Sequence, residues 1–131
     1  KMRPEFSTPD RMSFFDNLRS WILAQEERLW IAVPFVDELG VSLLNSSARA
    51  NDSRLVTRKA KVLQDLNTDK VSLRILDDLH AKYLLGDTEV YVGSPNLTYA
   101  SLLNNVELLF SLEDQDALKG LEDAFLYFWE S

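Results

Sequence analysis

The sequence predicts an α/β fold, in which a mixed, largely parallel β-sheet is flanked by helices on both faces. Short apolar runs of strand length alternate along the chain with longer segments whose apolar residues recur at helical spacing. Residues 29–33 (LWIAV) are apolar throughout, as is typical of a strand buried on both faces of a parallel sheet. The 131 residues are 46% hydrophobic, which is enough for one core and predicts one domain.

The first part of the chain, residues 1–12, contains two prolines and is expected to be a lead-in to a single domain over residues 13–131. Two interpretations of the first six residues stay open. They are either residues added by cloning or part of a larger protein from which the domain was cut.

The remaining elements are predicted from the spacing of apolar residues and from capping residues. Ser13 and Thr98 are expected to cap the helices that they precede, and acidic residues open the last helix, where the helix dipole favours negative charge. The predicted helices span residues 13–27, 37–50, 59–66, 98–103 and 114–130. The predicted strands span residues 29–33, 54–57, 71–76, 79–85, 88–92 and 106–112.

Two of these strands are joined by Gly86-Asp87, a turn-forming pair, and should form a hairpin. His80 and Lys82 would then lie on one face of the first strand, about 6–7 Å apart. Residues 93–96 (GSPN) follow the second strand and offer hydroxyl, amide and backbone N–H donors. An imidazole beside an ammonium group and such donors is suited to binding an anion. Among anions, a phosphate fits this arrangement best.

This pattern resembles the signature of the phospholipase D superfamily, which reads His-x-Lys, four residues, Asp, a gap and then Gly-Ser-x-Asn. Six residues fall on motif positions: His80, Lys82, Asp87, Gly93, Ser94 and Asn96. Five residues separate Asp87 from Gly93 where the usual pattern has six, and the turn between the two strands is where the missing residue does least harm. Asn105-Val106-Glu107 resembles the Asn-x-Glu that follows the motif in the small nuclease-like members.

The resemblance implies a metal-independent phosphodiesterase that forms a covalent phosphohistidine. That chemistry needs two histidines, one as nucleophile and one as acid, and this chain has one, so a homodimer is expected to complete the site. Lys82 and Asn96 would hold the phosphate, and Glu107 would brace His80. Asp87, Gly93 and Ser94 would support the site, with Asp87 holding the hairpin. Neither a cofactor nor a metal is implied.

Each of these assignments has a plainer alternative. A lone histidine in a strand is more often a satisfied core residue, and Glu107 could be a surface carboxylate at the start of a strand. An intact motif also occurs in proteins that only bind. A non-catalytic phosphate-binding or dimerisation module therefore remains one alternative, and a phospholipid or small-molecule phosphodiesterase of the same mechanism is the other.

Nucleic acid is the favoured substrate, because the chain has one motif, as in the nuclease-like branch, and has no basic amphipathic segment for membrane docking. The net charge of −7 opposes strong affinity for a polyanion. Four basic residues lie close together in the sequence: Arg54, Arg58, Lys59 and Lys61. They are either a basic cluster that binds nucleic acid or the solvated start of a helix. Weak affinity would also fit a cleavage module whose targeting domain lies elsewhere in a longer protein.

The chain contains no cysteine, no apolar run of about 20 residues and no signal-peptide pattern. We therefore expect neither disulfides nor a membrane span, and we expect a cytoplasmic location.

Overall fold

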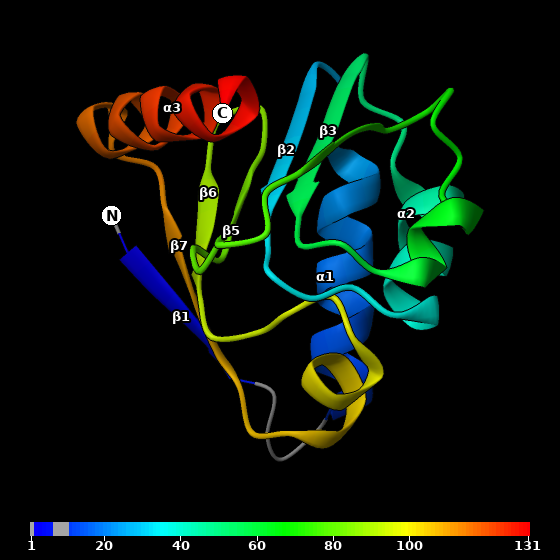
Figure 1. The fold of residues 1–131 in the computed structure, drawn as a ribbon. Helices are drawn as coiled ribbons and strands as arrows, with labels where there is room; N and C mark the ends of the chain where they lie inside the picture. Colours follow the sequence, from blue (N-terminus) through cyan, green and yellow to red (C-terminus); the bar gives the residue numbers. More distant parts are fainter. Residues whose placement is uncertain (1, 7–10) are drawn as a thin grey trace.

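A seven-stranded mixed sheet forms the centre of the computed structural model, which describes residues 2–6 and 11–131 (Figure 1). The strands are β1 (Met2–Phe6), β2 (Arg28–Ala32), β3 (Asp52–Thr57), β4 (Ser72–Ile75), β5 (Tyr83–Leu85), β6 (Val90–Gly93) and β7 (Leu108–Leu112). The helices are α1 (Arg11–Ala24), α2 (Glu38–Ser47) and α3 (Gln115–Glu130), together with a short 3₁₀ helix η1 (Lys61–Asp65) and a π-helical turn η2 (Ala100–Asn104).

The strands are ordered β1-β7-β6-β5-β2-β3-β4 across the sheet. Pairing is parallel between β2 and β3 and between β3 and β4, and antiparallel between all other neighbours. Only β5 and β7 therefore run against the common strand direction. The mixed sheet is confirmed, but its parallel pairings are confined to the β2-β3-β4 side.

Helices cover both faces of the sheet, as expected (Figure 1). Side chains alternate along β2, so Leu29 and Ile31 pack with α1 and α2 while Trp30 and Ala32 pack beneath α3. On the α3 side, Tyr83 donates a hydrogen bond to the carbonyl of Leu121 (2.9 Å), and burial raises the pKa of its phenol. None of the helices in the described residues has the length and apolarity that crossing a membrane requires.

The N-terminal lead-in prediction is wrong for residues 2–6, because they form β1 and extend the sheet beside β7. Backbone hydrogen bonding to β7 makes this segment a strand although Pro4 lies within it, and an edge strand tolerates proline. Of the same expected lead-in, Lys1 and residues 7–10 lie outside the described residues. Residues 11 and 12 already belong to α1, so Ser13 lies inside the helix and does not cap it.

Two predicted helices are present in altered form. Residues 59–66 form only η1, because Ala60 is extended and the backbone N–H of Lys59 is held by Asp77 (2.8 Å). The segment after the motif forms the π-helical turn η2, and the hydroxyl of Thr98 accepts a hydrogen bond from the N–H of Ser101 (3.2 Å). Thr98 therefore makes a capping-type contact, although it lies two residues before η2 and is not the residue next to its start.

The β5–β6 hairpin is confirmed, and the N–H of Gly86 donates to the carbonyl of Glu89 across its turn (2.8 Å). Its first strand is shorter than predicted, since β5 begins at Tyr83. The strand cannot start earlier because its neighbour β2 ends at Ala32, opposite Tyr83. His80 and Lys82 therefore lie in the irregular segment that enters β5, and the expectation that both lie on one strand face is wrong.

Candidate active site

The direction of the strands collects the motif residues at one edge of the sheet. β2, β3 and β6 end at this edge, while β5 and β7 begin there, because those two strands run in the opposite direction. The segments just outside these strand ends carry His80 and Lys82 before β5, Ser94 and Asn96 after β6, and Glu107 before β7. The edge is therefore a single site assembled from distant parts of the chain.

Lys82, Ser94 and Glu107 are linked by hydrogen bonds along this edge. The ammonium of Lys82 donates to the carbonyl of Ser94 (3.2 Å), and the hydroxyl of Ser94 donates to the carboxylate of Glu107 (2.5 Å). The same hydroxyl accepts from the backbone N–H of Leu108 (3.0 Å), and the amide of Asn105 donates to Glu107 (3.4 Å). Glu107 is buried, so its carboxylate acts through Ser94 to fix where Lys82 lies.

The strand order determines how far Glu107 lies from the residues that it is expected to assist. Glu107 precedes β7 and Lys82 precedes β5, so β6 lies between them and the two residues are about 10 Å apart. His80 lies two residues before Lys82 in the chain. Among the contacts of the described residues, none joins Glu107 to His80 within one chain. Ser94 and Asn105 are partners of Glu107 within one chain, and the expected brace on the imidazole stays a prediction.

Asn96 is fixed by both its side chain and its backbone. Its side-chain oxygen accepts a hydrogen bond from the N–H of Phe35 (3.2 Å), and its own N–H donates to the hydroxyl of Ser101 (3.0 Å). Neither contact uses the side-chain amide nitrogen, which can donate to a phosphate oxygen. Asp37 caps α2 and also accepts from the N–H of Tyr99 (2.8 Å), so the loop that carries Asn96 is tied to α2 as well.

His80 is exposed, and it lines a pocket of about 320 Å³. The pocket lies between the segment that enters β5 and the end of α3, which contributes Tyr127 and Phe128. A larger pocket of about 410 Å³ lies between α2 and η1, where its lining includes Glu38 and Asp65 but no motif residue. An exposed imidazole is suited to proton transfer or nucleophilic attack, and the core interpretation of His80 is wrong.

Asp87 lies at the opposite end of the hairpin, away from the other motif residues. Its carboxylate accepts hydrogen bonds from the backbone N–H groups of Glu26 (2.9 Å), Glu27 (3.0 Å) and Arg28 (2.9 Å). Burial raises the pKa of Asp87, but these three hydrogen bonds and the charge of Arg28 outweigh it and hold the pKa below its ordinary value. Asp87 fastens the hairpin turn to the α1–β2 junction.

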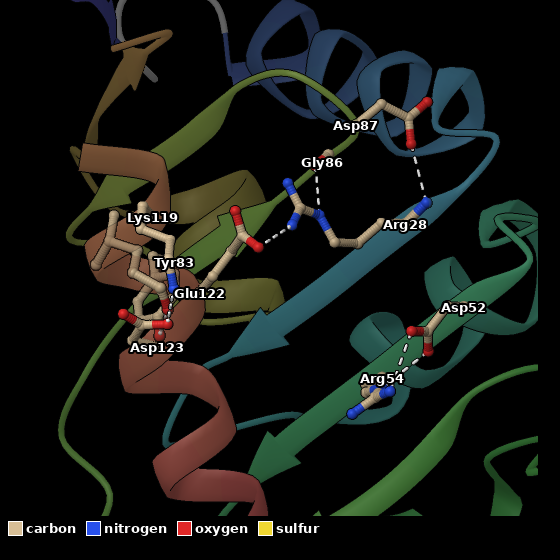
Figure 2. A network of polar contacts seen from close by, with 10 residues as sticks. Arg28, Asp52, Arg54, Tyr83, Gly86, Asp87, Lys119, Glu122 and Asp123 are labelled. Atoms are coloured by element: carbon tan, nitrogen blue, oxygen red, sulfur yellow. Dashed lines mark hydrogen bonds and ion pairs between the residues drawn. The ribbon is translucent and has the colours of Figure 1, made fainter. Parts of the chain in front are cut away.

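Arg28 reinforces the same junction, as Figure 2 shows. Its guanidinium donates to the carbonyl of Gly86 (2.8 Å) and forms an ion pair with Glu122 of α3 (3.1 Å). The hairpin turn is thus linked to α1, β2 and α3 together. The expectation that Asp87 holds the hairpin fits these contacts.

Gly93 is required by a close approach of two strands. A Cβ atom at this position would lie 2.1 Å from the carbonyl oxygen of Leu108 and 2.9 Å from the Cα of Leu109. Any side chain would push β7 away from β6 and would shift Glu107, which immediately precedes β7. Gly93 therefore supports the site through packing.

The four residues of the expected basic cluster have different surroundings. Arg54 pairs with Asp52 (2.8 Å), as Figure 2 shows. Its guanidinium lies over the rings of Trp30 and Trp129. Arg58 donates to the carbonyl of Leu79, next to His80 (2.9 Å). The side chains of the other two, Lys59 and Lys61, are exposed. Among the described contacts, Arg58 is the member of the cluster that touches the site.

Sequence reasoning missed Phe35, Tyr127 and Phe128. Phe35 directly follows Pro34, at the carboxyl end of a buried strand, and that position is the signal that could have revealed it. The two α3 residues gave no such signal, because their helix was predicted from its apolar face alone and its end meets His80 only in the folded chain.

Comparison with known proteins assigns the family. Residues 22–129 match the family described as "Cardiolipin synthase, PLD-like domain". The chain belongs to the phospholipase D superfamily. No curated protein matches the chain in sequence.

Solved structures of this superfamily share the fold over nearly the whole chain. NucT from Helicobacter pylori is 14% identical with a TM-score of 0.75, and the match covers 100% of this chain and 98% of NucT. Nuc from Salmonella typhimurium, a phospholipase D family member, is 14% identical with a TM-score of 0.76, covering 99% and 94%. Yeast tyrosyl-DNA phosphodiesterase is 14% identical with a TM-score of 0.58, covering 85% and 30%. The expected phospholipase D-like fold is confirmed.

Proposed function

We propose that the protein is a metal-independent phosphodiesterase that cleaves DNA or RNA through a phosphohistidine, at a site shared by two copies of the chain. The observation that carries the proposal is the gathering of His80, Lys82 and Asn96 at one sheet edge, with Lys82 held by Ser94 (3.2 Å). We infer that these residues supply a nucleophile, a cation and an amide donor to one phosphate.

The proposed reaction has two steps. In the first, an imidazole nitrogen of His80 attacks phosphorus, the bond to the leaving oxygen breaks, and a second histidine gives that oxygen its proton. In the second, this histidine takes a proton from water, and the water oxygen displaces the nucleophilic histidine from phosphorus. Lys82 offsets the negative charge that develops on the non-bridging oxygens in both steps.

A second copy of the chain is proposed because the sequence has one histidine and the reaction uses two. A two-fold axis near the exposed His80 would bring both imidazoles to one phosphate. The two imidazoles have to differ in protonation for the reaction to proceed. The neutral member attacks, and the charged member acts as the acid.

Nucleic acid is proposed as the substrate because one structure with this fold, yeast tyrosyl-DNA phosphodiesterase, is by its name an enzyme that acts on DNA. NucT and Nuc match this chain over nearly their whole length, so a chain of this size can form the complete fold. The net charge of −7 predicts weak binding to a polyanion outside the site itself. A targeting domain or partner would then supply affinity. The description of the matched family also names cardiolipin synthase, which makes a phospholipid phosphodiester the second candidate.

The test is incubation of the protein with labelled DNA, labelled RNA and phosphatidylcholine vesicles, each in EDTA. Cleavage of DNA or RNA is expected, and cleavage of the lipid alone would favour the second candidate. Activity that disappears in EDTA and returns with magnesium would contradict the histidine mechanism. An intact dimer that cleaves none of the three would leave a phosphate-binding module as the better description.

The His80→Ala variant is the control for a contaminating enzyme. It should lose turnover and keep the far-ultraviolet circular dichroism and the unfolding midpoint of the wild type, since His80 is exposed. Retained turnover would exclude His80 as the nucleophile.

A further inference from the structure

Phe35 is an aromatic side chain that remains 52% exposed although its backbone is firmly held. Its N–H donates to the side chain of Asn96 (3.2 Å) and its carbonyl accepts from the N–H of Leu97 (3.2 Å). Val36 continues this contact as a parallel bridge to Leu97. The ring therefore projects into solvent from a rigid backbone, one hydrogen bond away from the proposed phosphate site.

Arg58 lies against this ring. Its guanidinium is 5.2 Å from the ring centroid of Phe35, and its Nε donates to the carbonyl of Leu79 (2.9 Å). Phe35 is thus bonded to Asn96 through its own backbone N–H, and its neighbour Arg58 is bonded to the residue before His80. The segment that contains His80 and the segment that contains Asn96 are therefore both connected to this exposed phenylalanine.

We propose that Phe35, supported by Arg58, is a stacking platform for an unpaired nucleobase, so that the preferred substrate is single-stranded nucleic acid. This inference rests on the proposed function and names its substrate class. A nucleotide whose phosphate lies at His80 and Asn96 has its base one sugar away, where an exposed aromatic ring can stack on it. A paired base inside a duplex does not expose its face to such a ring.

The charge beside the ring favours a nucleobase over a lipid chain. A guanidinium against a ring adds cation–π attraction to a stacked system and places a positive charge beside the nucleic-acid backbone. An acyl chain gains nothing from that cation. Insertion into a lipid surface is accordingly the alternative that the experiment has to exclude.

The first measurement compares Phe35→Ala, Phe35→Trp and the wild type on three substrates in EDTA. The substrates are a single-stranded oligonucleotide, a duplex of the same sequence, and a strand whose residues around the scissile bond are abasic. Phe35→Ala should raise KM on the single strand about 5- to 100-fold with a smaller change in kcat, and Phe35→Trp should restore it. On the abasic strand Phe35→Ala and the wild type should have the same KM. Equal losses on the abasic and the normal strand would overturn the proposal.

The second measurement separates stacking from catalysis. The dissociation constant of the labelled single strand is compared between His80→Ala and the double variant His80→Ala/Phe35→Ala, so that no cleavage is needed. A larger dissociation constant in the double variant supports the stacking platform even where the proposed chemistry fails. An unchanged dissociation constant overturns the stacking proposal. Truncation of an exposed leucine on α1, Leu23→Ala, is the matched control and should change neither KM nor the dissociation constant.

Solution mass and vesicle binding complete the test. Phe35→Ala should keep the solution mass of the wild type, and a fall to half that mass would assign Phe35 to the subunit interface and overturn the proposal. Loss of binding to phosphatidylcholine vesicles, with unchanged binding to the single strand, would assign the ring to a lipid surface and overturn it as well.

Discussion

Lys82 shows how single residues set the chemistry of this site. Its ammonium is fixed by the carbonyl of Ser94, and the hydroxyl of Ser94 is fixed in turn by the buried carboxylate of Glu107. A cation held this way needs little reorganisation when negative charge builds up on a phosphate. The interaction is therefore worth most in the transition state.

Replacement of Lys82 by alanine should lower kcat roughly 10²- to 10³-fold while KM changes little, because the lost charge acts mainly on the transition state. Steady-state kinetics on the substrate identified in EDTA measure both constants. Lys119→Ala, at an exposed lysine of α3, is the control and should leave both unchanged. A Lys82→Ala variant that raises KM and keeps kcat would show that Lys82 serves substrate binding alone.

At the scale of elements, the β5–β6 hairpin connects the site to the rest of the fold. Lys82 enters it at one end, and Asp87 anchors its turn to the α1–β2 junction through three backbone hydrogen bonds. Two positions of one short motif would thus serve different purposes, the proposed chemistry at one end and attachment at the other.

Replacement of Asp87 by asparagine should lower the free energy of unfolding by about 1–3 kcal/mol at neutral pH, since charge-assisted bonds to three N–H groups are weakened. Because the pKa of Asp87 is lowered in the folded state, its contribution is complete above the ordinary pKa of 3.8 and is lost as the pH falls through the folded value. Urea unfolding of both proteins between pH 7 and pH 3 should show the difference shrinking at the acidic end.

The control for this measurement is Asp123→Asn, at an exposed carboxylate of α3 that pairs with Lys119. It should cost little at any pH, because exposed ion pairs contribute little. An Asp87→Asn variant with unchanged stability and no turnover would contradict the anchoring role and place Asp87 in the chemistry.

The hairpin also shows what the sequence could and could not predict. The turn at Gly86-Asp87 and the motif spacing are local signals, and they identified the hairpin and the residues at its ends. The strand length was overestimated, because the end of β2 at Ala32 limits β5 and no local signal in residues 79–85 reports that limit. Strand β1 was missed for the same reason, since its identity depends on pairing with β7, about one hundred residues away in the sequence.

Contacts of Glu107 were the least predictable part of the site. The motif placed Glu107 near His80, but the order of strands puts β7 and β6 side by side and makes Ser94 its partner. Strand order depends on the packing of the whole chain and is not encoded in any short segment. The same is true of Phe35 and Arg58, which follow the ends of the neighbouring parallel strands β2 and β3 and meet only when those strands align.

For the whole molecule, the central claim is that one chain supplies half of the catalytic site. The motif residues that we propose to surround the phosphate lie on one edge of the sheet, and the chain provides a single histidine there. A two-fold pair of chains would present the two edges to each other and create one site with two imidazoles. Activity would then belong to the pair and not to the chain.

The most direct test mixes the wild type with the inactive His80→Ala variant and lets the subunits exchange. If the site needs a histidine from each chain, three equivalents of the variant should reduce the activity of a fixed amount of wild type to about a quarter, because most wild-type chains are then paired with the variant. Activity that stays unchanged at every mixing ratio would show that each chain carries a complete site, and would contradict the shared centre.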